Sequence, residues 1–291
     1  MIYFDNAATT WPKPPGVSTA MVRFMEEVGS NLGRAGHRLA VEAGRIVYAA
    51  RQAIANLFHV GDPMRVVFGA NVTEALNLAL HSLLRPGELV ITSSVEHNSV
   101  MRLLRALEAR GVEVTVVACS PEGMLDPAQV EAAIRRHTPM IVLTHASNVV
   151  GTLLLVAEVG RIAGRHGLLF LVDAAQTAGA FPLDEVMLTQ RLIDSLLAIG
   201  GVRVYGGRVA ARQMATVSFR TDGMPPDEIG LRLDEEYGIL CRVGLHCSPT
   251  AHRTIGSFPA GTVRFGLGAM NTADEVDAAL AAVERLAGGT P

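Results

Sequence analysis

The stretch FLVDAAQTAGAFPLDEVMLTQRLIDSLLAIGG, residues 170–201, decides the fold. Its first half closes the apolar run LLFLV (168–172) with one carboxylate, Asp173, which is typical of the end of a buried strand. Its second half has the apolar spacing of an amphipathic helix. The stretch therefore marks the place where one structural layer ends and another begins.

Short apolar runs rich in β-branched residues alternate with helical patterns upstream of this stretch. The predicted strands are RVVFG (65–69), ELVITSS (88–94), VEVTVVA (112–118), MIVLTHAS (140–147) and LLFLVDAAQ (168–176). Such an alternation predicts an α/β fold, with a mostly parallel sheet covered by helices on both faces. Ligands of these sheets bind beyond the carboxyl ends of the strands, so the residues that follow each strand are the candidates for a site.

The pattern of polar and apolar residues changes after Gly201. Polar and apolar residues then alternate, which predicts a small α+β domain with one solvated sheet face. Thr272 and Glu275 have the spacing of a capping box at the start of the last helix. We expect a large domain over residues 1–184, with an N-terminal arm over 1–40, and a small domain over 185–291.

The composition is that of an ordinary soluble protein of enzyme size. The chain has 291 residues, 49% of them hydrophobic and 18% charged, with a net charge of −3, which gives no electrostatic case for nucleic-acid binding. No apolar run reaches membrane length, and no signal peptide is evident. Three cysteines are too few for a disulfide framework, so we expect a cytoplasmic protein.

Lysine is almost absent from the chain. Lys13 is the single lysine among the 25 basic residues; the rest are arginines, as a GC-rich genome favours. Any chemistry that needs a lysine amine therefore has one candidate.

Several residues near predicted strand ends have side chains suited to binding or catalysis. Asp173 needs a partner in its apolar setting, and either a protonated ring nitrogen or local backbone donors would serve; Gln176 follows three residues later. Thr73 begins a helix, where an anion or a plain N-cap is possible. His97 could stack on a flat ring, transfer a proton, or be purely structural.

The C-terminal part of the chain holds two further candidates. Cys247, beside His246 on a Gly- and Pro-punctuated loop, is either a thiolate nucleophile or a small buried residue. The spacing of Cys241, His246 and Cys247 fits no usual zinc site, so no metal is predicted. Arg264, mid-strand, needs a carboxylate from the protein or from a substrate.

Taken together, the segments of the chain resemble the class V aminotransferase-like enzymes of fold type I, which use pyridoxal phosphate (PLP). The nearest resemblance is to cysteine desulfurases and selenocysteine lyases. The matching stretches span both ends of the chain: IYFDNAATTWPKP (2–14), GSNLGRAGHRLA (29–40), ANVTEALN (70–77), SSVEHNS (93–99), THASNVVGT (144–152), VDAAQTAG (172–179), RVGLHCSPT (242–250) and TVRFGLGAMNT (262–272).

The resemblance implies a role for each matched position. Asp173 would pair with the pyridine nitrogen of PLP, and His97 would stack on its ring. Gln176 and Asn148 would contact the ring hydroxyl side or the substrate, and Thr73 would hold the phosphate.

Two further roles concern a small amino-acid substrate. Arg264 would take its carboxylate, and Cys247 would attack its sulfur and carry the persulfide. A homodimer, or a heterodimer with a paralogue, and a sulfur-acceptor protein are also implied.

One departure from the family pattern bears on activity. The family places a lysine, which links covalently to PLP, on a strand after VDAAQ, whereas this chain passes almost directly into the helix of the small domain. About 100 residues, a domain's worth, are missing between about Asp184 and Leu188. The shortened sheet would then close either by pairing of the 168–176 strand with the 65–69 strand or through a partner chain.

Four hypotheses follow. The chain is a desulfurase-like protein impaired or inactivated by loss of the lysine, binding PLP non-covalently if at all, or it is a working desulfurase with a rearranged site. Alternatively, it is a non-catalytic PLP-binding or scaffold protein, or a truncated or engineered chain.

Overall fold

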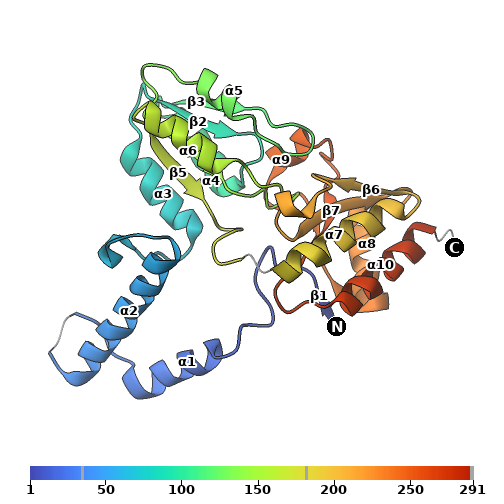
Figure 1. Ribbon diagram of the computed structural model, residues 1–291, viewed down its shortest axis with the longest axis horizontal. Helices are drawn as coiled ribbons and strands as arrows, with labels where there is room; N and C mark the ends of the chain where they lie inside the picture. The colour runs from blue at the N-terminus through green and yellow to red at the C-terminus, as the bar shows by residue number, and fades with distance from the viewer. Residues whose placement is uncertain (34–35, 181–182, 289–291) are drawn as a thin grey trace. The chain divides into compact units, whose positions relative to one another are not determined.

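A computed structural model describes residues 1–33, 36–180 and 183–288 of the chain. The chain divides into two compact units, one of Met1–Thr10 with Asn71–Pro291 and the other of Trp11–Ala70. The first unit contains all the predicted site residues (Figure 1). The predicted domain boundary at residues 184 and 185 lies inside this unit and stays a prediction. Residues 181–182 of the stretch that follows Asp173 lie outside the described residues.

A four-stranded parallel sheet forms the first half of the large unit. Its strands are β2 (Leu89–Ser93), β3 (Glu113–Val117), β4 (Met140–Thr144) and β5 (Leu169–Asp173), in the spatial order β3-β2-β4-β5. All neighbouring strands run parallel. This confirms the α/β fold with a parallel sheet.

Helices cover both faces of this sheet, as the sequence predicts. Helices α3 (Val72–Leu83) and α4 (Asn98–Glu108) pack on the face that carries Val90 and Val142. Helices α5 (Pro127–Ala132) and α6 (Val156–Arg165) pack on the face that carries Ile91 and Leu143. Because successive side chains of a strand point to opposite faces, the unbroken apolar runs of β2 and β4 fill both cores at once.

The sheet ends at β5, which pairs only with β4 among the described strands. Leu169 is 50% exposed and Val172 37% exposed, in contrast to the wholly buried β2 and β4. An edge of this kind leaves one row of backbone donors and acceptors without a strand partner.

The strand predicted at residues 65–69 does not form. Pro63–Arg65 is a short 3-10 turn (η2), the following residues 66–69 are assigned to no strand, and Val67 is 75% exposed. A parallel strand needs a neighbouring strand to satisfy its backbone groups. Residues 65–69 and the 168–176 strand belong to different units, so both expected closures of the sheet, by pairing of these two segments or through a partner chain, stay predictions.

An antiparallel sheet forms the second half of the large unit. Its strands β6 (Val202–Tyr205), β7 (Thr216–Thr221), β9 (Arg242–Gly244) and β10 (Thr262–Gly266) have the order β6-β7-β10-β9. Helices α7 (Leu183–Ala198), α8 (Pro226–Tyr237) and α10 (Ala273–Gly288) share one core with it, while α9 (Pro249–Thr254) and the turn η3 (Ala210–Arg212) lie in its connections.

The N-terminus joins this second half of the unit. Strand β1 (Ile2–Tyr3) pairs in parallel with β8 (Ile239–Leu240), and Phe4 packs edge-to-face on Phe265 of β10. The capping box at the start of α10 is confirmed, because the backbone N–H of Glu275 donates to Thr272 and that of Thr272 donates to Glu275. The first residues of the chain are thereby fixed beside β10, where the candidate Arg264 lies.

The unit Trp11–Ala70 is helical. It contains α1 (Val17–Arg23), which continues into a π-helical turn η1 (Phe24–Val28), and the long α2 (Arg38–Leu57), capped by the imidazole of His37. Lys13 belongs to this unit. No helix of the described residues is long and apolar enough to cross a membrane.

Candidate active site

The carboxyl ends of three neighbouring strands carry the predicted polar residues. Strand β2 leads into His97, β4 into Asn148 and β5 into Asp173 and Gln176. Since the strands are parallel and adjacent, these residues emerge at one edge of the sheet, as expected for a ligand site.

A buried carboxyl that sequence reasoning missed links two of these strand ends. Glu96 is 0% exposed; the hydroxyl of Ser93 donates to its Oε1 at 2.5 Å, and the backbone N–H of Thr144 donates to both oxygens at 3.0 and 2.9 Å. Burial raises its pKa to about 8, although these hydrogen bonds act in the opposite direction. Glu96 thus ties the end of β2 to the end of β4.

His97 is the N-cap of α4. Its Nδ1 accepts a hydrogen bond from the backbone N–H of Ser99 at 3.1 Å and lies 2.6 Å from the Ser99 hydroxyl, which is itself 3.0 Å from the hydroxyl of Thr73. These contacts assign the proton of the neutral ring to Nε2. Burial lowers the pKa of His97, helped by Arg264 and Arg102 and opposed by Asp173. The imidazole is therefore held neutral and in one orientation.

Thr73 lies in the first turn of α3, and Asn71 provides the helix cap by accepting from the backbone N–H of Glu74 at 2.9 Å. An anion site and a plain N-cap were both considered for this helix start, and the plain N-cap is made by Asn71. The hydroxyl of Thr73 is left to contact Ser99.

One cavity brings three of the predicted residues together. It has a volume of about 440 Å³ and is lined by Thr73, His97 and Cys247, with Asn98 and Arg102 among the other lining residues. This volume is in the range that holds a small molecule. Residues far apart in the sequence thus share one binding space.

The loop of Cys247 has an unusual backbone. His246 and Cys247 both have positive φ angles, 48° and 57°, which residues other than glycine seldom adopt. The carbonyl of Cys247 accepts from the backbone N–H of Asn98 at 2.9 Å, so the loop is attached to the start of α4. Cys247 is an exposed residue, which makes its thiol a candidate for reaction.

Asn148 fixes the same loop from the β4 side. Its amide nitrogen donates to the carbonyl of His246 at 2.7 Å, and its amide oxygen accepts from the hydroxyl of Ser248 at 2.8 Å. These hydrogen bonds fix the residues on both sides of Cys247. They offset the free-energy cost of the strained backbone between those residues.

Two buried histidines lie close together in this region. The rings of His246 and His252 are 5.2 Å apart, and burial lowers their pKa values to about 2 and about 4. Nε2 of His246 bonds the Thr262 hydroxyl, and Nδ1 of His252 bonds the Ser257 hydroxyl. Both rings are therefore neutral structural groups at ordinary pH.

Asp173 and Gln176 both have protein partners. Asp173 is buried, and its Oδ1 accepts from the backbone N–H of Ala175 at 3.0 Å. The amide of Gln176 donates to the carbonyl of Ala7 at 3.1 Å. A local backbone donor, one of the two partners considered for Asp173, is thus present.

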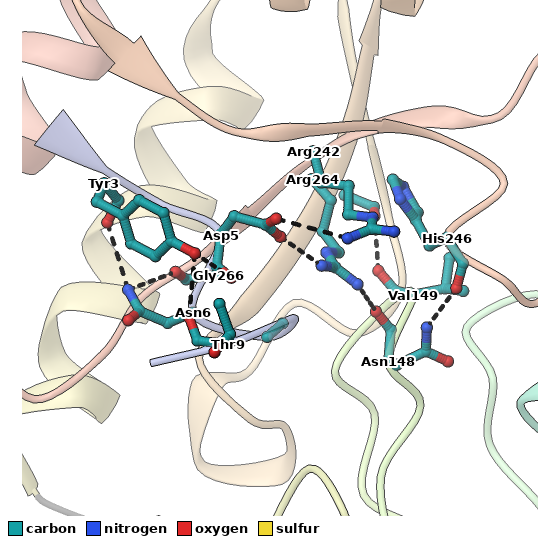
Figure 2. A network of polar contacts seen from close by, with 12 residues as sticks. Tyr3, Asp5, Asn6, Thr9, Asn148, Val149, Arg242, His246, Arg264 and Gly266 are labelled. Atoms are coloured by element: carbon teal, nitrogen blue, oxygen red, sulfur yellow. Dashed lines mark hydrogen bonds and ion pairs between the residues drawn. The ribbon is translucent and has the colours of Figure 1, made fainter. Parts of the chain in front are cut away.

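Arg264 is paired within the protein (Figure 2). Its Nη2 donates to Oδ1 of Asp5 at 2.7 Å and its Nη1 to the carbonyl of Asn148 at 2.9 Å, and the residue is only 2% exposed. Arg242 lies on the other side of the same carboxylate, 3.7 Å from Oδ2. Asp5 therefore lies between two guanidinium groups. Its hydrogen bond with Arg264 joins residues that are 259 positions apart in the sequence.

The residues at the strand ends fit PLP in chemical type. A buried carboxylate is available for a protonated ring nitrogen, a fixed imidazole for the ring face, and the hydroxyls of Thr73 and Ser99 at two helix starts for a phosphate. The charge of Asp173 also acts on His97, because it raises the pKa that burial lowers. The donor set agrees with the resemblance, apart from the lysine.

Comparison with known proteins supports this reading. The family model for aminotransferase class-V matches residues 2–188 and 184–279. A probable cysteine desulfurase of Methanothermobacter thermautotrophicus is 27% identical over 383 residues, covering 99% of this chain and 95% of the relative. That alignment is longer than the 291 residues of this chain, so part of the relative has no counterpart in it. The two matched segments meet at 184–188, where the missing segment is predicted.

Other relatives match only in part. The cysteine desulfurase IscS of Pectobacterium carotovorum is 36% identical over 211 residues, covering 70% of this chain and 51% of the relative. The chain thus spans about half the length of this relative.

Solved structures agree in fold. The apo structure of a cysteine desulfurase from Thermococcus onnurineus NA1 has a TM-score of 0.88 at 22% identity, covering 99% of this chain and 95% of that one. The cysteine desulfurase CsdA of Escherichia coli has a TM-score of 0.81 at 20% identity, with coverages of 97% and 94%. The predicted fold type is therefore confirmed, and the chain belongs to the aminotransferase class-V family, whose members use pyridoxal phosphate.

Proposed function

We propose that this chain is a cysteine desulfurase-like protein that takes sulfur from a small amino acid onto Cys247. The observation that carries the proposal is the cavity shared by Cys247, His97 and Thr73, at the sheet edge that also carries Asp173. The cysteine desulfurases among its relatives support the same reaction class.

The side chains at this edge would hold PLP without a covalent bond. Asp173 would bind the ring nitrogen, His97 would lie against the ring, and Thr73 with the start of α3 would bind the phosphate. Gln176 and Asn148 would contact the ring hydroxyl side or the substrate. Bound there, PLP would supply an acceptor for the electron pair left on the substrate when its carbon–sulfur bond breaks.

Cys247 would act as the sulfur acceptor. Its thiolate would form a bond to the substrate's sulfur, which becomes the outer sulfur of a persulfide. His97, neutral and with its proton on Nε2, is a candidate to deliver a proton in the same cavity. Exposure of Cys247 supports transfer to an acceptor outside the protein.

We further propose that turnover is impaired. Lys13, the single lysine, lies between prolines in the N-terminal arm and is a poor substitute for the family's lysine, so general acid–base assistance by a lysine would be lost. Loss of such assistance costs roughly 10²–10⁴-fold in rate. Membership of the family also supports a dimer, with a second copy or an intact paralogue, a sulfur-acceptor protein, and work in the cytoplasm.

The test is a titration of the purified chain with PLP, followed by borohydride treatment and measurement of the intact mass. We expect a PLP absorbance that the D173A variant loses, and no covalent adduct. An adduct on Lys13 would contradict non-covalent binding, and absence of any PLP binding would favour the scaffold alternative.

Sulfur transfer is tested separately. The chain is incubated with PLP and L-cysteine, and Cys247 is alkylated and its peptide analysed by mass. We expect a trapped persulfide at Cys247 that depends on PLP and is absent from C247S. A persulfide that forms equally without PLP would refute the proposed reaction.

Residue Arg264 remains the predicted anchor for the substrate carboxylate. Because Asp5 already pairs with it, a substrate would have to compete with a carboxylate of the protein for the same guanidinium.

A further inference from the structure

Asp5 lies at the start of a series of contacts that ends at the Cys247 loop, residues 245–248 (Figure 2). Its carboxylate accepts from Nη2 of Arg264 at 2.7 Å, and Nη1 of Arg264 donates to the backbone carbonyl of Asn148 at 2.9 Å. The side chain of Asn148 in turn fixes the residues on both sides of Cys247. Residues from distant parts of the sequence thus connect the N-terminus to the candidate nucleophile.

A second contact of Asp5 reaches the strand that precedes the same loop. Its Oδ2 lies 3.7 Å from Nη1 of Arg242 on β9, and β9 ends at Gly244 and leads directly into the loop. Arg242 and Arg264 are directly opposite each other on β9 and β10, where two like charges destabilise a sheet. The carboxylate of Asp5 therefore counters the repulsion between two cations that flank the Cys247 loop.

Arg264 depends on Asp5 for its charge balance. The residue is 2% exposed, its Nε has no hydrogen-bond partner among the described residues, and Asp5 is the one acid of that part of the chain within ion-pair distance. Burial lowers the pKa of Arg264, and Asp5 opposes this effect. Because a buried charge that loses its partner is strongly destabilising, the position of the Arg264 side chain depends on this carboxylate.

The backbone of Asp5 is fixed independently of the loop. The N–H of Asn6 donates to the carbonyl of Gly266 on β10 at 3.1 Å, and the N–H of Gly266 donates to the carbonyl of Phe4 at 2.7 Å. Phe4 is wholly buried. Asp5 is therefore anchored on both sides, whereas the Cys247 loop has a strained backbone that needs support from its surroundings.

We propose that Asp5 is a positioning residue for Cys247. Through Arg264 and Asn148, its carboxylate fixes the Cys247 loop while no substrate is bound. A substrate carboxylate that takes the place of Asp5 on Arg264 would keep the guanidinium neutralised, so the loop would keep its support during the exchange. This exchange rests on the proposed function, whereas support of the loop by Asp5 requires neither PLP nor substrate.

Hydrogen exchange of the unliganded chain, followed by mass spectrometry of its peptides, tests this role. The backbone N–H of Ser248 donates to the carbonyl of Leu245 at 2.8 Å, and that of Asn98 donates to the carbonyl of Cys247 at 2.9 Å. Both amides therefore exchange when the loop opens. In D5N, which keeps the size of the side chain without its charge, we expect them to exchange about 2- to 30-fold faster, the range for a residue that acts through a network of contacts.

Two comparisons separate positioning from a general loss of stability. V283A leaves a cavity in the core beside α10, so it lowers overall stability, but it should leave the exchange of the two loop amides unchanged. Acetate supplies the carboxylate that a D5G variant lacks. We expect acetate to slow the exchange of these amides in D5G, whereas chloride at equal ionic strength should not.

The route of the effect is tested with N148A, which removes both hydrogen bonds from the Asn148 side chain to the loop. If Asp5 acts through Asn148, D5N speeds the exchange less in the N148A background than in the wild type. The proposal is overturned by equal exchange in D5N and wild type, by a rescue of D5G no greater with acetate than with chloride, or by strict additivity of D5N and N148A.

The same proteins separate this inference from the proposed function. Loop exchange that depends on Asp5, in a chain that forms no PLP-dependent persulfide, would refute the desulfurase proposal alone. A PLP-dependent persulfide, in a chain whose loop exchange is unaffected by D5N, would refute the positioning role alone.

Discussion

Replacing Glu96 with glutamine should change how the stability of the protein depends on pH. Glutamine keeps an oxygen that can accept from the backbone N–H of Thr144, and it resembles the protonated acid in charge and shape. The wild-type carboxyl has a folded-state pKa of about 8, against 4.5 for its ordinary value, because burial disfavours the charged form. The folded protein therefore retains a proton that the unfolded chain releases.

The sign and size follow from this difference. Below pH 4.5 both states bind the proton, and the stabilisation by the protonated form is fully present; it is lost as pH rises through about 8. Each pH unit in that window lowers the free energy of unfolding by about 1.4 kcal/mol, so the whole window is worth about 5 kcal/mol. A loss of this size is a large part of the stability of a typical domain.

The assay is urea unfolding followed by circular dichroism at pH 5, 6, 7 and 8. The free energy of unfolding of wild type minus that of E96Q should fall steadily across this range. His246 and His252 have lowered pKa values and destabilise the fold as pH falls below 6.5, but both proteins share them, so they cancel. E284Q, which changes an exposed carboxyl of α10, is the matched control. A difference that is constant from pH 5 to 8 would refute the reasoning.

Three further substitutions test the packing and the buried ion pair. D5N leaves the buried guanidinium of Arg264 without its anionic partner and should lower the free energy of unfolding by about 2–3 kcal/mol in urea denaturation; an unchanged midpoint would show that the pair contributes nothing. G230A forces a Cβ against the side chain of Val243 and should cost about 1–2 kcal/mol, whereas G164A, which meets open space in α6, should add about 0.5–1 kcal/mol. Equal melting temperatures for these two alanine variants would contradict the packing described.

The sequence predicted the layers of the large unit well, because its strands are local signals. The apolar runs of β2 and β4 supply both faces of the sheet, so their burial follows from composition alone. The segment 65–69 has the same kind of composition but is not a strand in the described structure, and a strand cannot form without a neighbour. Strand formation depends on partners that a local pattern does not show.

Three of the predicted site residues, Thr73, His97 and Cys247, line one cavity, and their roles stay predictions. Of these three, only His97 follows a strand of the parallel sheet, so the rule that ligands bind at strand ends does not by itself place Thr73 and Cys247 there. The role of His97 as a helix cap and the pairing of Arg264 with Asp5 depend on contacts that sequence spacing does not reveal. A glutamate three residues after a buried strand was the available signal for Glu96.

The strand order β3-β2-β4-β5 has a consequence for how such a sheet tolerates loss of chain. The path from β2 through β3 and β4 to β5 is complete within the remaining sheet, and the chain leaves it from the outermost strand. Removing sequence beyond β5 therefore severs no crossover and no ladder among the four strands that stay. Sequence at this edge of the sheet can therefore be lost, while the strands that carry or lead into His97, Asn148 and Asp173 keep their register.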